Sequence, residues 1–111
     1  MDNGFYATLV EGTIAQAGIT VIEDNRIRGG DSEFLYSGTI ELNGDEVVAN
    51  LRFRSYASSG SNNFVDFTER DFELSLSGQV TDNGFRVTGY SPSGREIEVI
   101  GKRLSAIDFS D

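Results

Sequence analysis

Acidic side chains are the most abundant groups in this chain that can carry out chemistry. The 111 residues include 18 aspartates and glutamates, but no histidine and no cysteine. A metal or acid–base site would have to be built from carboxylates, whose oxygens bind hard cations when they converge at the right spacing. The densest group is Asp66, Glu69, Asp71 and Glu73. Arg70 lies among them and no EF-hand spacing is present, so we interpret this group as a solvated face.

A second pair of carboxylates, Glu96 and Glu98, shares one face of an alternating segment. Paired carboxylates hydrolyse glycosidic bonds in many enzymes. Here they alternate with Ile97 and Val99, which is typical of a strand whose carboxylates face solvent. The chain also lacks the commonest general base and the thiol nucleophile. We therefore expect that the protein is not an enzyme and that it needs no cofactor or metal.

The run Gly29-Gly30-Asp31-Ser32 has two interpretations. Successive backbone N–H groups in such a run can form a nest that binds an anion. The composition favours a tight turn or bulge, in which the Asp31 carboxylate accepts a hydrogen bond from the backbone two residues further on.

An acidic hairpin tip is indicated by Asn43, Gly44, Asp45 and Glu46. Asn-Gly between two alternating segments is a strong hairpin signal, because a type I′ turn needs positive φ at both central residues. Asp82-Asn83-Gly84 is a second signal for a type I′ hairpin. An exposed acidic tip can dock on a basic partner through charge complementarity. The alternative is an ordinary solvated hairpin.

A basic strip follows the next predicted strand, at Arg52, Arg54 and Tyr56. Basic and aromatic side chains on one strand face can stack nucleic acid. The net charge of −9 repels phosphate, so we expect no direct nucleic-acid binding. Cross-strand salt bridges or an arginine-rich dimer interface are the favoured interpretations.

These residues must be positioned by β-strands, because apolar residues recur at every second position through most of the chain. In the clearest segment, Val47, Ala49, Leu51 and Phe53 share one face. About eight strands at a spacing of roughly ten residues predict a barrel or sandwich. We expect strands at residues 4–11, 19–23, 26–28 (with a break at 29–30), 34–40, 46–56, 71–79, 85–90 and 95–104, with a loop at 57–63 and a further short strand or helical turn at 64–68.

Every clear strand is expected to have one apolar and one polar face, which suits an up-and-down antiparallel barrel whose closure removes exposed edges. An open sandwich is the alternative. The predicted organisation is a single all-β domain over residues 1–104 with a C-terminal tail at 105–111. A small barrel of this kind is either filled by side chains or holds one small ligand. Filling is the default with this many aromatics, and the lumen is expected to be lined by residues that include Tyr36, Phe53, Phe72 and Phe85.

No apolar run approaches the roughly 18 residues of a membrane span. The first residues, Met1-Asp2-Asn3-Gly4, carry neither a positive region nor an apolar core. They do not read as a secretory signal. We therefore expect a cytoplasmic protein.

The stretch from Asn25 to Phe53 resembles the GrlR family of negative regulators of type III secretion. The resemblance rests on Ile27, the Gly29-Gly30-Asp31 turn, a strand with Tyr36-x-Gly38, an acidic turn, and a strand ending at Arg52-Phe53. It implies an eight-stranded barrel related to the lipocalins and calycins, often a homodimer. In the characterised members of that family, the protein binds and sequesters a transcriptional activator, and an exposed Glu-Asp-Glu-Asp loop makes the contact. Here that loop reads Leu42-Asn43-Gly44-Asp45, so only Asp45 falls in register.

Two functions follow as expectations. The first is a non-enzymatic regulatory or adaptor protein that acts by protein contact through the tip. The second is a carrier or sensor that binds a small apolar ligand inside the barrel. An internal void of some hundreds of Å³ would favour the carrier, and a filled interior would favour protein contact.

Overall fold

The computed structural model describes residues 1–11, 16–56 and 70–111. The predicted loop at 57–63, the predicted element at 64–68, and the carboxylates Asp66 and Glu69 lie outside the described residues. The strands are β1 (Gly4–Glu11), β2 (Gln16–Glu23), β3 (Arg26–Gly30), β4 (Phe34–Asn43), β5 (Glu46–Ser55), β6 (Asp71–Thr81), β7 (Gly84–Tyr90) and β8 (Glu96–Ser105).

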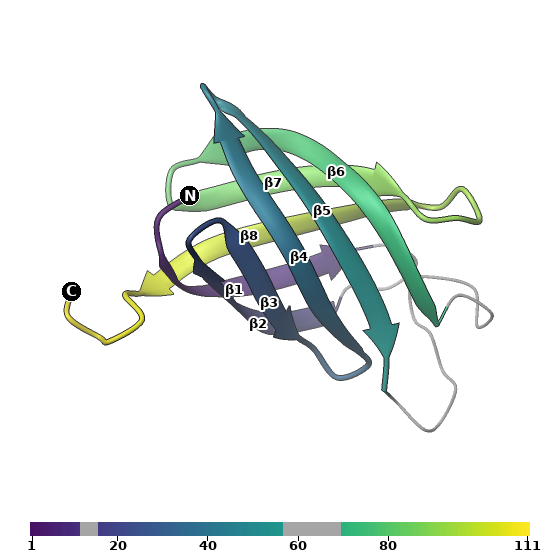
Figure 1. The fold of residues 1–111 in the computed structure, drawn as a ribbon, viewed down its shortest axis with the longest axis horizontal. Helices are drawn as coiled ribbons and strands as arrows, with labels where there is room; N and C mark the ends of the chain where they lie inside the picture. Colours follow the sequence, from purple (N-terminus) through teal and green to yellow (C-terminus); the bar gives the residue numbers. More distant parts are fainter. Residues whose placement is uncertain (12–15, 57–69) are drawn as a thin grey trace.

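Each strand pairs antiparallel with the next one in sequence, and β8 pairs with β1 to close a barrel (Figure 1). The predicted up-and-down barrel is confirmed, and the open sandwich is wrong. The turns after β2, β4 and β6 lie at the same end of the barrel as both termini; we call this the tight end. Strands β1, β3, β5 and β7 end at the other end of the barrel, which we call the loop end.

The core occupies the inside of the barrel, because alternate residues of every strand point inward. The predicted inner face of β5 is confirmed, with Val47, Ala49, Leu51 and Phe53 all buried. Towards the loop end, Phe53 stacks on Phe72 with ring centroids 5.2 Å apart, and Tyr36 meets Phe53 edge-on at 5.0 Å. Towards the tight end, Tyr6 contacts Phe85 with ring centroids 5.9 Å apart.

The β-turns differ from the prediction at two hairpins. The β4–β5 pairing joins Asn43 to Glu46, so the central turn residues are Gly44 and Asp45, and only Gly44 has positive φ. That pattern belongs to a type II′ turn rather than the expected type I′ turn at Asn43-Gly44. At the β6–β7 turn, neither Asp82 nor Asn83 has positive φ, so the type I′ prediction is wrong there too.

Strand β3 does not break at the two glycines as predicted; it continues to Gly30. A side chain at Gly29 would overlap the Ile19 carbonyl oxygen and the Thr20 side chain, so glycine is what lets β3 approach β2 this closely. Strand β2 begins at Gln16, before the predicted 19. Strand β6 runs to Thr81, beyond the predicted 79.

The expectation of one polar face on each clear strand is wrong for β1. Tyr6 and Val10 point inward, while Phe5, Ala7 and Leu9 lie on the outer face and are half-buried. The tail packs outside the barrel, where Phe109 stacks on Phe5 with ring centroids 5.7 Å apart. Asp111 holds the tail in place by accepting a 2.8 Å hydrogen bond from the Ala106 N–H.

Candidate functional site

The acidic tip projects from the tight end of the barrel as the β4–β5 hairpin (Figure 1). All four predicted residues, Asn43, Gly44, Asp45 and Glu46, are exposed. The Val80 N–H donates a 3.2 Å hydrogen bond to the Asp45 carbonyl oxygen, which ties the tip to β6. Neither the Asp45 nor the Glu46 carboxylate forms an ion pair with any residue that the structure describes. The tip therefore presents two solvated negative charges on an anchored turn.

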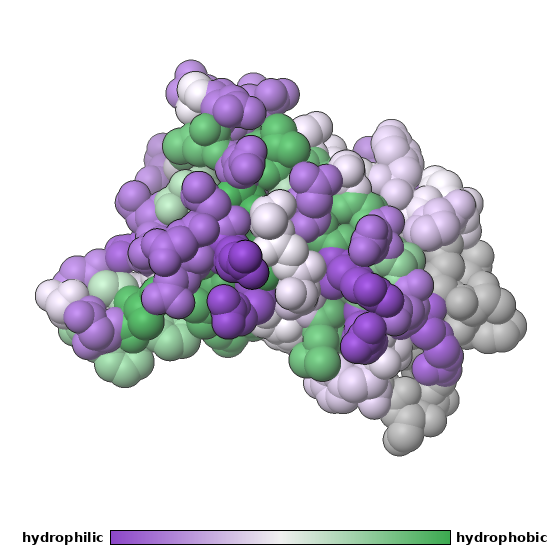
Figure 2. Space-filling model, viewed as in Figure 1, coloured by the Kyte–Doolittle hydropathy of each residue, from purple (hydrophilic) through white to green (hydrophobic). Residues whose placement is uncertain are grey.

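An open hollow of about 360 Å³ lies at the same end of the barrel, below the tip. Its rim includes three exposed apolar side chains, Leu42, Val80 and Leu104. Figure 2 shows hydrophilic atoms at the projecting tip and an apolar band directly beneath it. Sequence analysis missed this hollow, because its walls come from both termini and from two hairpins that are distant in sequence.

Tyr6 lines the hollow from the barrel interior and is almost fully buried. Its hydroxyl donates a 2.7 Å hydrogen bond to the Asp2 carbonyl oxygen. Burial raises the pKa of this hydroxyl, and the negative charge of Asp2 raises it further. Tyr6 therefore stays protonated at neutral pH and acts as a hydrogen-bond donor rather than as a base.

The predicted basic strip is engaged in cross-strand salt bridges, as one interpretation of the sequence expected. Arg52 Nε lies 2.7 Å from one oxygen of Asp71, and Arg54 Nε lies 3.2 Å from the other. The hydrogen bond from Arg52 is the main reason that the pKa of Asp71 falls below its ordinary value. Tyr56 does not join the strip; its hydroxyl donates to the Asp31 carbonyl oxygen at the loop end.

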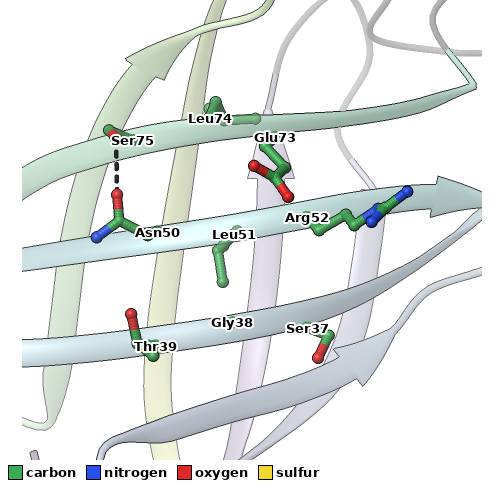
Figure 3. Close-up of a pocket in the computed structure, with 9 residues that line it drawn as sticks. All are labelled: Ser37, Gly38, Thr39, Asn50, Leu51, Arg52, Glu73, Leu74 and Ser75. Atoms are coloured by element: carbon green, nitrogen blue, oxygen red, sulfur yellow. Dashed lines mark hydrogen bonds between the residues drawn. The ribbon is translucent and has the colours of Figure 1, made fainter.

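A shallow polar groove of about 510 Å³ crosses the outer face of β4, β5 and β6 (Figure 3). Ser75 Oγ donates a 2.7 Å hydrogen bond to Asn50 Oδ1 across its floor. Its charged groups are Arg52 and Glu73, which lie opposite each other in the β5–β6 pairing. The lining contains one carboxylate, Glu73, and no histidine. Its serine and threonine hydroxyls therefore lack the base and orienting group that activate a nucleophile. The groove can form hydrogen bonds but shows no nucleophile–base arrangement.

The other carboxylates singled out in the sequence lie on the outer surface wherever the structure describes them. Glu98 pairs with Arg86 at 2.6 Å, and Glu96 is exposed. Asp71 and Glu73 both lie on the outer face of β6. Within residues 1–11, 16–56 and 70–111, no three acidic side chains converge as metal ligands would.

Asp31 organises the loop end as the turn interpretation predicted. Its Oδ1 accepts 2.8 Å hydrogen bonds from the N–H groups of Glu33 and Phe34. Its Oδ2 accepts a hydrogen bond from the Tyr36 hydroxyl, which gives that buried tyrosine a partner at the mouth of the barrel. Asp31 is thus a structural hub whose side-chain oxygens are already occupied by groups of the chain itself.

The four predicted lumen residues, Tyr36, Phe53, Phe72 and Phe85, are all buried inside the barrel. The structure also places two hydroxyls there that sequence analysis missed, those of Thr8 and Thr20. Neither hydroxyl oxygen has a hydrogen-bond partner among the residues that the structure describes. The inward alternation of β1 and β2 contained this signal, since Thr8 lies between Tyr6 and Val10.

The fold and these surfaces define a small, closed, antiparallel β-barrel protein of the lipocalin and calycin type, with a packed interior and an acidic hairpin at one end. No protein-family model matches the chain. No curated protein matches it either. In the part of the chain that the structure describes, no helix has the length and apolar character needed to span a bilayer.

Proposed function

We propose that this barrel is a non-enzymatic regulatory or adaptor protein that acts by contacting another protein through its acidic tip. The observation that carries the proposal is the pair of exposed carboxylates of Asp45 and Glu46, which have no described ion-pair partner and stand above an apolar-rimmed hollow. Such a surface suits a basic protein segment that also carries an apolar anchor, because charge steers the encounter and burial of the anchor holds it.

A transcriptional activator is the partner class that the GrlR resemblance suggests, and DNA-binding proteins generally carry basic surfaces. The proposal then includes a cytoplasmic site of action and a homodimer, as that resemblance implies. The altered tip sequence leaves Asp45 and Glu46 as the acidic residues available for the contact.

The carrier function has less support. The side chains expected to line a ligand cavity instead pack against one another, with Phe53 in ring contact with both Tyr36 and Phe72. An apolar ligand at that level of the barrel would have to displace these contacts, each worth about 0.5–1.5 kcal/mol beyond the buried area.

The test compares two double variants of equal charge. Asp45→Ala/Glu46→Ala removes the tip carboxylates, and Glu73→Ala/Glu96→Ala removes two exposed carboxylates towards the loop end. Each variant and the original chain is used to capture proteins from the source lysate, and affinity for the captured partner is then measured at several salt concentrations.

We expect the tip variant to bind its partner roughly tenfold more weakly and with a shallower salt dependence, while the loop-end variant binds normally. Equal affinity of both variants for a stoichiometric partner would refute the tip as the contact. Retention of a small molecule on the purified chain, with no protein partner, would favour the carrier instead.

A further inference from the structure

The outer face of β1 and β2 is apolar along its length. β1 contributes Phe5, Ala7 and Leu9, and the pairing places them beside Val21, Ile19 and Ala17 of β2. On the other side, Leu9 pairs with Ile100 of β8. We call this surface the β1–β2 face, defined by Phe5, Ala7, Leu9, Ala17, Ile19, Val21 and Ile100. Phe109 of the tail stacks on Phe5 and covers the face at its tight end, so Ile19 marks the exposed part.

This composition is unusual for the outside of a barrel whose inside is already the core. Antiparallel strands with one solvated face normally alternate apolar and polar residues, as β4, β5 and β6 do here at the polar groove. Ile19 in the middle of the β1–β2 face is 49% exposed and points away from the core inside the barrel. A contiguous apolar surface of this kind marks an interaction site.

We propose that the β1–β2 face is where two copies of this chain pack together. The inference deepens the homodimer part of the proposed function and makes no use of the acidic tip. It also replaces the interface expected at Arg52, Arg54 and Tyr56, because both arginines are already paired with Asp71.

A second copy fits this face better than an unrelated protein for reasons of shape. Homodimer interfaces are more apolar than interfaces between proteins that associate transiently. In a two-fold interface the same patch of both copies meets, so the patch must be complementary to itself. The small side chains of Ala7 and Ala17 adjoin the larger ones of Ile19 and Leu9 in the strand pairing. The surface therefore offers both hollows and projections, as two sheets packed face to face at about 10 Å need.

The charges around the face also suit self-association. Its rim carries both signs, with Glu11 and Glu23 at strand ends and Arg28 and Lys102 on the flanking strands β3 and β8. No carboxylate lies among the seven residues of the face itself, although the whole chain has a net charge of −9. Two acidic copies can thus approach on this side with the least repulsion.

The β1–β2 face is about 27 Å long along the eight residues of β1 and about 14 Å wide across three strands, which is roughly 400 Å². A standard interface buries about 800 Å² per partner, so the face supplies about half of such a contact and the residues around it must supply the rest. The β1–β2 face would form the apolar centre of this contact, and the charged residues would form its rim.

The first test substitutes Ile19→Glu and measures the oligomeric state by analytical ultracentrifugation over a range of concentrations. Tyr90→Glu is the control, since Tyr90 is a large exposed side chain on β7, away from the face, and is more accessible than Ile19 (65% against 49% exposed). We expect Ile19→Glu to raise the dimer dissociation constant at least about 100-fold, because a two-fold interface contains the substitution twice. Tyr90→Glu should leave it unchanged.

A second test does not depend on a disruptive charge. The chain has no cysteine, so Ile19→Cys and Tyr90→Cys each introduce a single thiol. Under mild oxidation, we expect covalent dimers from Ile19→Cys and far fewer from Tyr90→Cys. Comparable cross-linking of both variants would overturn the proposal.

The outcomes separate the face from the rest of the proposed function. A monomer at all concentrations overturns both the face and the homodimer, whereas a dimer that Ile19→Glu leaves intact overturns the face alone. Salt gives an independent check, because screening should tighten an apolar contact between two acidic copies but weaken a charged contact at the tip. If Ile19→Glu remains dimeric but loses the captured partner, the face binds that partner and self-association through it is refuted.

Discussion

Two buried threonines provide a direct test of how the barrel interior is packed. Thr8 and Thr20 are 4% and 1% exposed, and neither hydroxyl oxygen has a hydrogen-bond partner within the described part of the chain. A buried polar group left without a partner costs about 1–3 kcal/mol. Valine retains the β-branched shape of threonine without its hydroxyl. We therefore expect Thr20→Val to raise the free energy of unfolding by about 1 kcal/mol or more, which corresponds to an increase in Tm of roughly 4 °C.

The control for this substitution is Thr39→Val, at an exposed position on the outer face of β4. It reports any general gain from placing valine in a strand, which is then subtracted from the effect at Thr20. Urea denaturation gives both free energies, and an unchanged m-value ensures that they refer to the same transition.

The opposite result would refute the reasoning about the interior. If Thr8→Val and Thr20→Val are each less stable than Thr39→Val, the two hydroxyls have partners in solution. Enclosed water would be the simplest such partner, since a buried water needs a few polar groups to bind it. The interior would then be partly wet rather than fully packed.

Two further predictions concern the core and the outer salt bridges. Leu51→Ser should lower the free energy of unfolding by about 4 kcal/mol, because it leaves a cavity and buries a hydroxyl. The control Val48→Ser lies on the outer face of β5 and should cost less than half as much. Equal losses of the two variants in urea denaturation would contradict the strand register. Asp71→Asn should lower the Tm near pH 7 but not near pH 2. The reason is that the folded-state pKa of Asp71 is depressed by Arg52, so its stabilisation is present above about pH 4 and is lost as pH falls through the folded pKa. A Tm difference that persists at low pH would show that the aspartate acts through something other than its charge.

The barrel could be anticipated because the period of two is visible in the residues that matter most. Val47, Ala49, Leu51 and Phe53 point inward as their alternation predicts, and so do Phe72 and Leu74. The Asp31 turn was also predictable, since a short acidic side chain after two glycines has few other hydrogen-bonding options. These are local relations, in which each residue acts on neighbours a few positions away.

The errors arose where the outcome depends on distant parts of the chain. The register along the whole β4–β5 hairpin decides whether Asn43 lies in the turn or ends strand β4, and the two possibilities differ by a two-residue shift in the pairing. The hollow below the tip needs the N-terminus beside the β6–β7 turn, which only barrel closure brings about. In β1 both alternating sets of residues are largely apolar, and alternation alone cannot show which set faces the core and which lies on the outer surface.

The division between the inside and the outside of this barrel argues for a protein that works by contact. The inside is lined with rings that pack on one another, so most of its apolar surface is already used for folding. The outside carries two unlike surfaces that stability does not explain: an apolar β1–β2 face and an acidic tip whose charges have no described partner. Packing of the barrel interior requires neither an apolar side chain at the outward position of Ile19 nor carboxylates at Asp45 and Glu46. The two proposed binding surfaces, one for a second copy and one for a basic partner, would account for both features, and their opposite expected responses to salt allow each to be tested while the other is intact.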